Sequence, residues 1–275
     1  MKPLTLYVLL VLLTFCFSST FSQNNKFPYK LSKTNDAIII STALSSSLLY
    51  YYLDSNYPIN YLKENEAVNL NRNKINSFDR SATYNWSPKA DNASDYFRDG
   101  LKYAPALIIF PEIKNRQWNN IFILGVMYLE GFLINSSFTS NTKITAQRIR
   151  PYMYNNDLSE DSRMKLSKEE TTYKSFYSGH TSSAFFNAVF ISKVVTDIYG
   201  KSGYTYTVWG ICLTTAATTG YLRYEAGKHF PTDIIVGAIT GGAIGYLIPM
   251  IHKQKYDKLI MLITPDNQIG FRLVF

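Results

Sequence analysis

Stretches without charged residues alternate with polar segments along the chain, and the apolar stretches are long enough for helices. Residues 37–53, 204–222 and 234–251 carry no charge and are rich in Ile, Leu, Tyr and small residues. Residues 118–134 form a further apolar stretch that carries Glu130. In residues 178–198 the apolar positions recur every three to four residues, as on one face of a helix. This pattern predicts a bundle of helices, with the first of them either buried or in a membrane.

The remaining segments are polar or short. Residues 54–103 are rich in Asn, Asp and Lys, which favours short helices and loops over a sheet. Residues 104–110 form a short apolar run that we expect to stop at Pro111, and residues 137–177 are expected to be a polar connection. Residues 259–264 and 269–275 flank a Pro-Asp-Asn turn and predict a β-hairpin. The expected fold class is therefore all-α, a helical bundle with a short C-terminal β-hairpin.

Residues 1–22 have the layout of a secretory signal peptide. A positive start at Lys2 precedes an apolar run from Leu4 to Phe17, and small residues then precede an expected cleavage before Gln23. A first membrane anchor is the alternative, although the run is shorter than the roughly 20 residues that a span needs. The expected division of the chain is a signal peptide (1–22), an N-terminal helical and polar segment (23–103), a core bundle (104–251) and a basic tail with the hairpin (252–275).

Composition narrows the class of protein. Hydrophobic residues make up 46% and charged residues 17%, which excludes a disordered or coiled-coil chain. The net charge of +8 favours an anionic partner. With 2 Cys and 3 His, a disulfide framework and a Cys/His zinc module are both excluded. We expect Cys212 to be buried and inert, and His252 to be interfacial or solvated.

Three polar clusters stand at the ends of expected helices. The first is Lys143, then six residues, then Arg150 and Pro151; the second is Ser178-Gly179-His180; the third is Arg223, five residues, His229, three residues and Asp233. Singly, each has an ordinary explanation as a solvated basic face or a helix cap. Together they place two of the three histidines and three cations where helix N-termini attract anions.

Such a set of residues fits a site for a dianionic phosphate. Arg150 and Arg223 suit bidentate contact with its oxygens, and Lys143 suits a point-charge contact. A neutral His229 could attack phosphorus if Asp233 holds its other nitrogen, and His180 could protonate the leaving alkoxide. We expect no metal or other cofactor, because the acidic residues near these motifs lack a ligand spacing.

The three clusters, in this order and with these internal spacings, resemble the three-part signature of the type 2 phosphatidic acid phosphatase / vanadium haloperoxidase superfamily. The resemblance covers residues from about 100 to 251. It implies a helical bundle with the site at one end and a phosphohistidine intermediate on His229, supported by Asp233, with His180 as the acid. It also implies that phosphate is bound by Lys143, Arg150, Ser178, Gly179 and Arg223. Tyr177 stands where the family has proline and Leu222 where it has serine, so one hydroxyl donor to the phosphate is missing.

The expected function is a metal-independent phosphatase of the cell envelope that acts on a phosphomonoester or pyrophosphate carried on a lipid, a small soluble phosphoester being the alternative substrate. A vanadate-dependent haloperoxidase has the same fold and is one alternative function. A non-catalytic envelope binding protein is another. No nucleic-acid partner is expected. Residues 202–222 and 234–251 approach the length of a membrane span, and the basic residues after 251 resemble a cytoplasmic flank. We expect a periplasm-facing protein that is integrated in or associated with the membrane, a soluble periplasmic bundle being the alternative.

Overall fold

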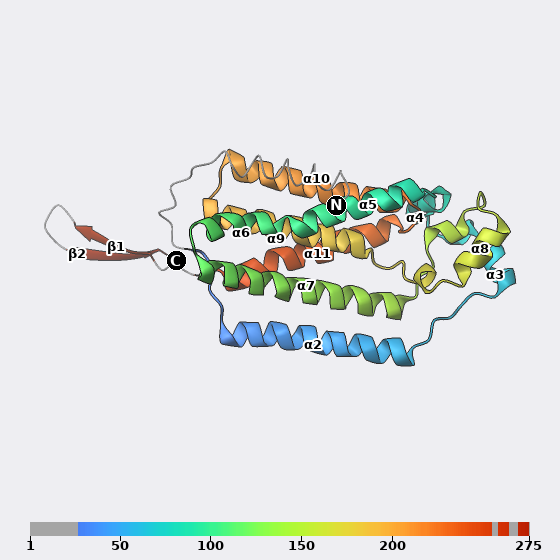
Figure 1. The fold of residues 1–275 in the computed structure, drawn as a ribbon, viewed down its shortest axis with the longest axis horizontal. Coiled ribbons are helices and arrows are strands. Elements are labelled where there is room, and N and C mark those ends of the chain that lie inside the picture. Colours follow the sequence, from blue (N-terminus) through green and yellow to red (C-terminus); the bar gives the residue numbers. More distant parts are fainter. Residues whose placement is uncertain (1–26, 255–257, 264–268, 275) are drawn as a thin grey trace.

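Helices dominate the computed structural model, which describes residues 27–254, 258–263 and 269–274. The all-α bundle expected from the sequence is confirmed (Figure 1). The signal peptide expected over residues 1–22 lies outside the described residues. The long helices are α2 (Lys33–Asn56), α5 (Pro88–Tyr103), α6 (Pro105–Lys114), α7 (Trp118–Ala146), α9 (Gly179–Tyr199), α10 (Gly203–Glu225) and α11 (Pro231–His252).

Shorter elements complete the described chain. Helices α3 (Glu64–Val68), α4 (Ser77–Arg80) and α8 (Glu160–Ser167) gather with short 3₁₀ turns at one end of the bundle, on the right in Figure 1. The 3₁₀ turns are Arg72–Lys74, Ser81–Tyr84, Pro151–Tyr154 and Glu170–Tyr173. Strands β1 (Lys258–Ile263) and β2 (Ile269–Val274) pair antiparallel, with Lys258 opposite Val274 and Ile263 opposite Ile269.

Helix α9 lies at the centre of the bundle and packs against α5, α7, α10 and α11. Its Phe186, Phe190 and Val194 are among the most buried side chains of the protein. Burial of one such side chain contributes about 1.5–3 kcal/mol, so the centre of the bundle is where most of its stability arises. Cys212 of α10 is buried in the same core, as expected.

Glycines of α11 set the closest helix contact. A β-carbon built on Gly237, Gly241 or Gly245 would lie 2.7, 2.0 and 2.5 Å from the carbonyl oxygens of Ser178, Ser182 and Phe186. The residue numbers increase by four on both helices from one contact to the next. Helices α9 and α11 therefore run parallel, with their backbones in contact. The small-residue stripe therefore brings the N-termini of these two helices to the same end of the bundle.

Helices α7 and α10 run antiparallel to α9. Along α9 from Gly179 to Phe186, the contacts on α7 move back from Lys143 to Gly131. On α10, Gly220 packs near Thr181, whereas the indole N–H of Trp209 donates to the Thr196 hydroxyl at 2.9 Å. The C-terminal ends of α7 and α10 therefore meet the N-terminal ends of α9 and α11.

Two helix boundaries differ from the sequence-based expectation. Helix α7 continues through the segment expected to be a polar connection and ends at Ala146, so that Lys143 lies in its last turn. Helix α6 contains Pro111 in its interior and ends at Lys114. A proline removes one backbone hydrogen bond and disfavours the helix, but flanking residues can keep helical geometry around it.

Large apolar side chains cover much of the outer surface of the bundle. Ile239 of α11 is 66% exposed, Phe122 of α7 63% and Leu48 of α2 70%. Two stretches, Trp118–Tyr154 and Pro231–His252, contain helices long and apolar enough to cross a membrane. Such broad apolar exposure is unusual for a surface in contact with water.

Candidate active site

The four helix ends bring the predicted site residues to one place. Lys143 comes from the last turn of α7, the Ser178-Gly179-His180 cluster from the start of α9, and Arg223 from the last turn of α10. His229 and Asp233 flank the start of α11. A β-carbon on Gly179 would lie 3.2 Å from Lys143 Nζ, so this glycine lets the ammonium approach the first turn of α9.

The cations of the site are buried. Arg150 is 9% exposed and Arg223 3% exposed. Among the described residues, the Nε atom of each has no hydrogen-bond partner. A buried guanidinium N–H without an acceptor is costly, and an oxyanion would supply that acceptor.

His229 is buried among these charges. Its Nδ1 lies 2.7 Å from the backbone carbonyl oxygen of Ser175, which can only accept a hydrogen bond. The proton of the neutral ring is therefore on Nδ1, and Nε2 keeps its lone pair. Burial and then the charges of Arg223, Arg150, Lys143 and His180 hold the pKa of His229 well below its usual value of 6.5. The ring is neutral at physiological pH, as a nucleophile must be.

Asp233 has a different place from the one expected. Its Oδ2 lies 3.7 Å from His229 Nδ1, which is too far for a hydrogen bond. The carboxylate instead accepts from the Ser175 hydroxyl at 2.6 Å and from the Phe230 N–H at 2.9 Å. The acceptor that orients His229 is thus the Ser175 carbonyl, while Asp233 fixes the segment around it.

Arg148 holds Asp233 from the other side. Its guanidinium donates to Asp233 Oδ1 at 2.5 Å and to Asp79 Oδ2 at 2.8 Å, and it stacks over the Phe230 ring. Asp79 also accepts from the Thr232 backbone N–H at 3.0 Å. The first turn of α11 is therefore tied to α4 through charged hydrogen bonds, although nothing in the sequence signature named Arg148 or Asp79.

His180 lies against α5. Its Nε2 is 2.8 Å from Asp95 Oδ1 and 2.5 Å from Arg98 Nη1. Burial is the main reason that the pKa of His180 is lowered to about 4; the charges of Arg223 and Arg98 lower it further, whereas Asp95 raises it. Without an anion in the site His180 is therefore neutral at pH 7, and a bound phosphate would favour its protonated form.

Asp91, also on α5, pairs with the cations from the same side. It forms an ion pair with Arg223 through Oδ1, and its Oδ2 lies 3.2 Å from Lys228 Nζ. Burial alone would raise the pKa of Asp91, but Arg223 and Lys228 outweigh burial and lower it. A carboxylate of the protein thus pairs with Arg223, one of the cations expected to bind phosphate.

Ser178 acts as a helix cap in this structure. Its Oγ accepts from the Thr181 N–H at 3.4 Å and from the Thr181 hydroxyl at 2.9 Å. Its own hydroxyl proton is left to donate elsewhere. The backbone N–H groups of Gly179 and His180 belong to the first turn of α9, where amides lack intrahelical partners.

The carboxylates of this site are engaged with cations. Asp79, Asp91, Asp95 and Asp233 each pair with an arginine or a lysine. Within the described part of the chain, Asp36, Glu130 and His252 form the group of His and carboxylate side chains close enough to share a metal ion. The donor set at the helix ends is therefore suited to an anion.

Parts of the chain are similar to known proteins. Residues 121–257 match the model of the PAP2 superfamily. A lipid A 4′-phosphatase of Porphyromonas gingivalis is 26% identical over 147 residues, which cover 54% of this chain and 58% of that protein. The chain thus spans less than two thirds of the length of this relative. A crystal structure of Aquifex aeolicus LpxE aligns at 22% identity with a TM-score of 0.42, over 62% of this chain and 90% of that one.

The matched region contains all three clusters of the signature, from Lys143 to Asp233, and four helix ends bring them together. The resemblance inferred from the residues is confirmed by the family match. The chain belongs to the PAP2 superfamily.

Proposed function

We propose that the protein is a metal-independent lipid phosphatase of the cell envelope that works through a phosphohistidine on His229. The observation that carries this proposal is the hydrogen bond from His229 Nδ1 to the Ser175 carbonyl, at 2.7 Å. It leaves the Nε2 lone pair free, in a site where Lys143, Arg150 and Arg223 are close enough to lower the pKa of the ring.

In the first step Nε2 of His229 attacks phosphorus, and the bond from phosphorus to the ester oxygen breaks. His180 gives its proton to the leaving oxygen, so that an alcohol and not an alkoxide departs. Charge on the equatorial phosphate oxygens is stabilised by the cations and by the first-turn amides of α9. Asp233 stabilises the positive charge that the His229 ring gains when it binds phosphorus.

In the second step water attacks the phosphohistidine. His180, now neutral, takes a proton from this water, and the phosphorus–nitrogen bond breaks. Inorganic phosphate and neutral His229 are the products, and His180 is protonated again. Asp95 supports both steps because it stabilises the protonated form of His180.

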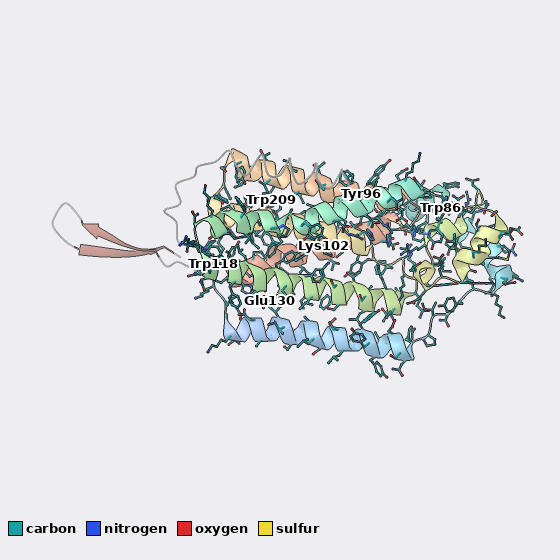
Figure 2. The ribbon with its side chains drawn as sticks, in the orientation of Figure 1. Trp86, Tyr96, Lys102, Trp118, Glu130 and Trp209 are labelled. Atoms are coloured by element: carbon teal, nitrogen blue, oxygen red, sulfur yellow. The ribbon has the colours of Figure 1, made fainter. Side chains whose placement is uncertain are left out.

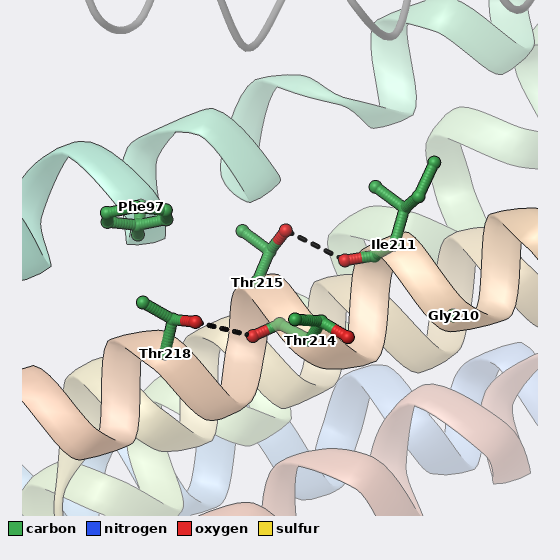
Figure 3. A pocket seen from close by; sticks show the side chains of 6 residues that line it. All are labelled: Phe97, Gly210, Ile211, Thr214, Thr215 and Thr218. Carbon is green, nitrogen blue, oxygen red and sulfur yellow. Dashed lines mark hydrogen bonds between the residues drawn. The ribbon is translucent and has the colours of Figure 1, made fainter.

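A cavity beside the site supports a lipid as the carrier of the phosphate. It measures about 330 Å³ and lies between α5 and α10, lined by Phe97, Gly210, Ile211, Thr214, Thr215 and Thr218 (Figure 3). The hydroxyls of Thr215 and Thr218 donate to carbonyls of their own helix, so they do not need a polar ligand. Thr218 precedes Arg223 by about 7 Å of helical rise. An acyl chain in this cavity would begin close to the phosphate-binding cations.

The apolar outer surface supports a membrane location. Exposed apolar side chains lie on α2, α7, α10 and α11, whose lengths match the hydrocarbon core of a bilayer. The site lies at one end of these helices, which suits a phosphate at the headgroup level. The net charge of +8 favours anionic lipids, and the P. gingivalis relative is a lipid A 4′-phosphatase.

Trapping the intermediate tests the mechanism. We expect purified protein with ³²P-labelled lipid phosphate and EDTA to form an acid-labile, alkali-stable phosphoenzyme. His229→Asn should abolish the label. His180→Asn should still give a burst of nitrophenol from p-nitrophenyl phosphate, because that leaving group needs little protonation, but turnover should be slow. Activity that disappears with EDTA and returns with Mg²⁺ would contradict the mechanism.

Substrate and location are tested separately. Release of phosphate from lipid A, phosphatidate, undecaprenyl pyrophosphate and a soluble ester, measured on one preparation, ranks the substrates. We expect the lipid phosphates to exceed the soluble ester in kcat/KM. Carbonate extraction of the envelope fraction should leave the protein in the membrane pellet.

A further inference from the structure

A second cluster of titratable side chains lies far from the active site. Asp36 of α2, Glu130 of α7 and His252 of α11 place one ligand atom each within 4.8 Å of one another. Glu130 and His252 are each 2% exposed. Of the two expectations for His252, interfacial or solvated, the solvated one is therefore wrong. Glu130, labelled on α7 in Figure 2, precedes Lys143 by about 20 Å of helical rise. The cluster is thus separate from the phosphate site.

The histidine of this cluster is oriented like a metal ligand. His252 Nδ1 lies 2.9 Å from the Ile248 carbonyl oxygen, which fixes the proton of the neutral ring on Nδ1. The lone pair of Nε2 then points at two carboxylate oxygens, Asp36 Oδ1 at 3.0 Å and Glu130 Oε2 at 3.2 Å. Metal-binding histidines commonly donate their other N–H to a backbone carbonyl in this way.

The separations fit a tetrahedral ion. Nitrogen and oxygen ligands of Zn²⁺ lie about 2.0–2.2 Å from the metal, which at tetrahedral angles puts two ligands roughly 3.3–3.6 Å apart. The two contacts from His252 Nε2, at 3.0 and 3.2 Å, are slightly shorter than this range, so a small outward shift of the carboxylates would admit the ion. One nitrogen and two carboxylate oxygens also form a chemically ordinary donor set for zinc.

Glu130 is the least satisfied member of the cluster. Within the described part of the chain, neither of its carboxylate oxygens has a hydrogen-bond partner. A proton on His252 Nε2 would be donated to Asp36, where the geometry is that of a hydrogen bond, and Glu130 would keep only a charge contact with the ring at 3.2 Å. A buried carboxylate without a partner is strongly disfavoured, and a divalent cation would engage all three side chains at once.

We propose that Asp36, Glu130 and His252 bind a divalent transition-metal ion of the zinc type, which fastens α2 to the bundle. Such an ion would add to the contacts of α2 with α7, since Ala43 is the one buried residue of α2 in the described structure. The chain around the cluster is already held in place: the Asp36 carboxylate accepts from the Ser32 N–H at 3.0 Å, and Tyr29 pairs with Lys253 in a β-bridge. The ion is structural, and the phosphatase chemistry proposed above does not pass through it.

Metal analysis of the full chain in detergent tests the proposal. After incubation with Zn²⁺ and desalting, we expect about one zinc per chain by mass spectrometry in the wild type, and a loss of that zinc in Glu130→Gln. Glu112→Gln is the matched control, because Glu112 is also buried but accepts from the Asn120 amide at 2.8 Å. The control should keep its zinc.

Two further measurements do not depend on Glu130→Gln folding. Asp36 lies at the edge of the cluster, and Asp36→Asn should lower zinc affinity in a protein that still folds. A chelator should lower the melting temperature of the wild type and of Glu112→Gln, but not of Asp36→Asn. Phosphoenzyme formation should persist with the chelator present. Wild-type protein that holds no more zinc than Asp36→Asn or Glu130→Gln would overturn the proposal and leave a protonated His252 as the occupant.

Discussion

A β-carbon added to Gly241 would lie 2.0 Å from the carbonyl oxygen of Ser182, so α11 and α9 touch through their backbones at this pair. The same contact aligns the starts of both helices, and with them His180 and Asp233. The geometry of the active site therefore depends on a residue that carries no chemistry.

We expect Gly241→Ala to force α9 and α11 apart. Overpacking of this kind destabilises by about 1–3 kcal/mol, which exceeds the ~1 kcal/mol that alanine gains over glycine in a helix interior. The melting temperature in detergent should fall by several degrees, and activity should fall with it. Gly242→Ala is the control, because its β-carbon would meet Val189 Cγ2 at an ordinary 3.7 Å. Equal stability of the two variants would contradict the close packing.

Asp95 controls the proton on His180. Because Asp95 raises the pKa of His180, Asp95→Asn should lower it further below about 4 in the free enzyme and lower it in the substrate complex as well. The general acid must be protonated, so the basic limb of the kcat profile should move to lower pH. At pH 7 we expect a loss of about 10²-fold, the low end of what a general acid contributes.

Asp99→Asn is the matched control for Asp95→Asn. Asp99 pairs with Arg98 Nε at 2.9 Å and is tied to His180 only through that arginine. Its pH profile should stay close to that of the wild type. A basic limb that moves as far in Asp99→Asn as in Asp95→Asn would show that any change of charge on α5 has the same effect.

We expect Asp91 to compete with a bound phosphate for Arg223, with which it forms an ion pair. Asp91→Asn removes the competing charge, and a hydrogen bond to a charged group contributes about 1.5–3 kcal/mol, so inorganic phosphate should bind about tenfold tighter or more. The inhibition constant of phosphate measures this. Asp54→Asn, a charge change at an exposed position of α2, should leave it unchanged. Weaker phosphate binding in Asp91→Asn would mean that Asp91 positions the cations instead of competing for them.

Asp233 acts on His229 by charge, and the Ser175 carbonyl fixes the tautomer. Asp233→Asn should therefore lower the rate of phosphoenzyme formation by about 10–10²-fold, less than the roughly 10⁴-fold loss seen where such a change imposes the wrong tautomer. Ser175→Ala keeps the carbonyl and loses only the hydroxyl. Its phosphorylation rate should be nearly normal, with a modest loss of stability. A loss of 10⁴-fold in Asp233→Asn would instead make Asp233 the orienting acceptor.

The bundle and the members of the three clusters could be predicted from the sequence because helical periodicity and fixed spacings are local signals. His180, His229 and Arg223 stand at helix ends that the apolar stretches already marked. The partners of these residues could not be predicted. Asp91 and Asp95 lie in a polar stretch that suits a solvated helix equally well, and only the packing of α5 against α9 and α10 gives them their cations.

Two other differences between the sequence-based expectation and the structure also arise from tertiary packing. Lys143 lies in an extension of α7 whose polar residues gave no helical signal, and tertiary contacts on α9 sustain it. His252 follows the apolar run of α11 and precedes basic residues, which made solvent the simplest expectation. Its burial arises from the approach of α2, a segment more than two hundred residues earlier in the chain.

The Nε atoms of Arg150 and Arg223 have a consequence for the native state as a whole. Each is a buried N–H donor for which the described residues supply no acceptor, and such a donor lowers the free energy of unfolding by about 1–3 kcal/mol. A phosphate bound as proposed would supply acceptors for both donors. We therefore expect substrate or inorganic phosphate to raise the melting temperature of the protein as well as to occupy its active site.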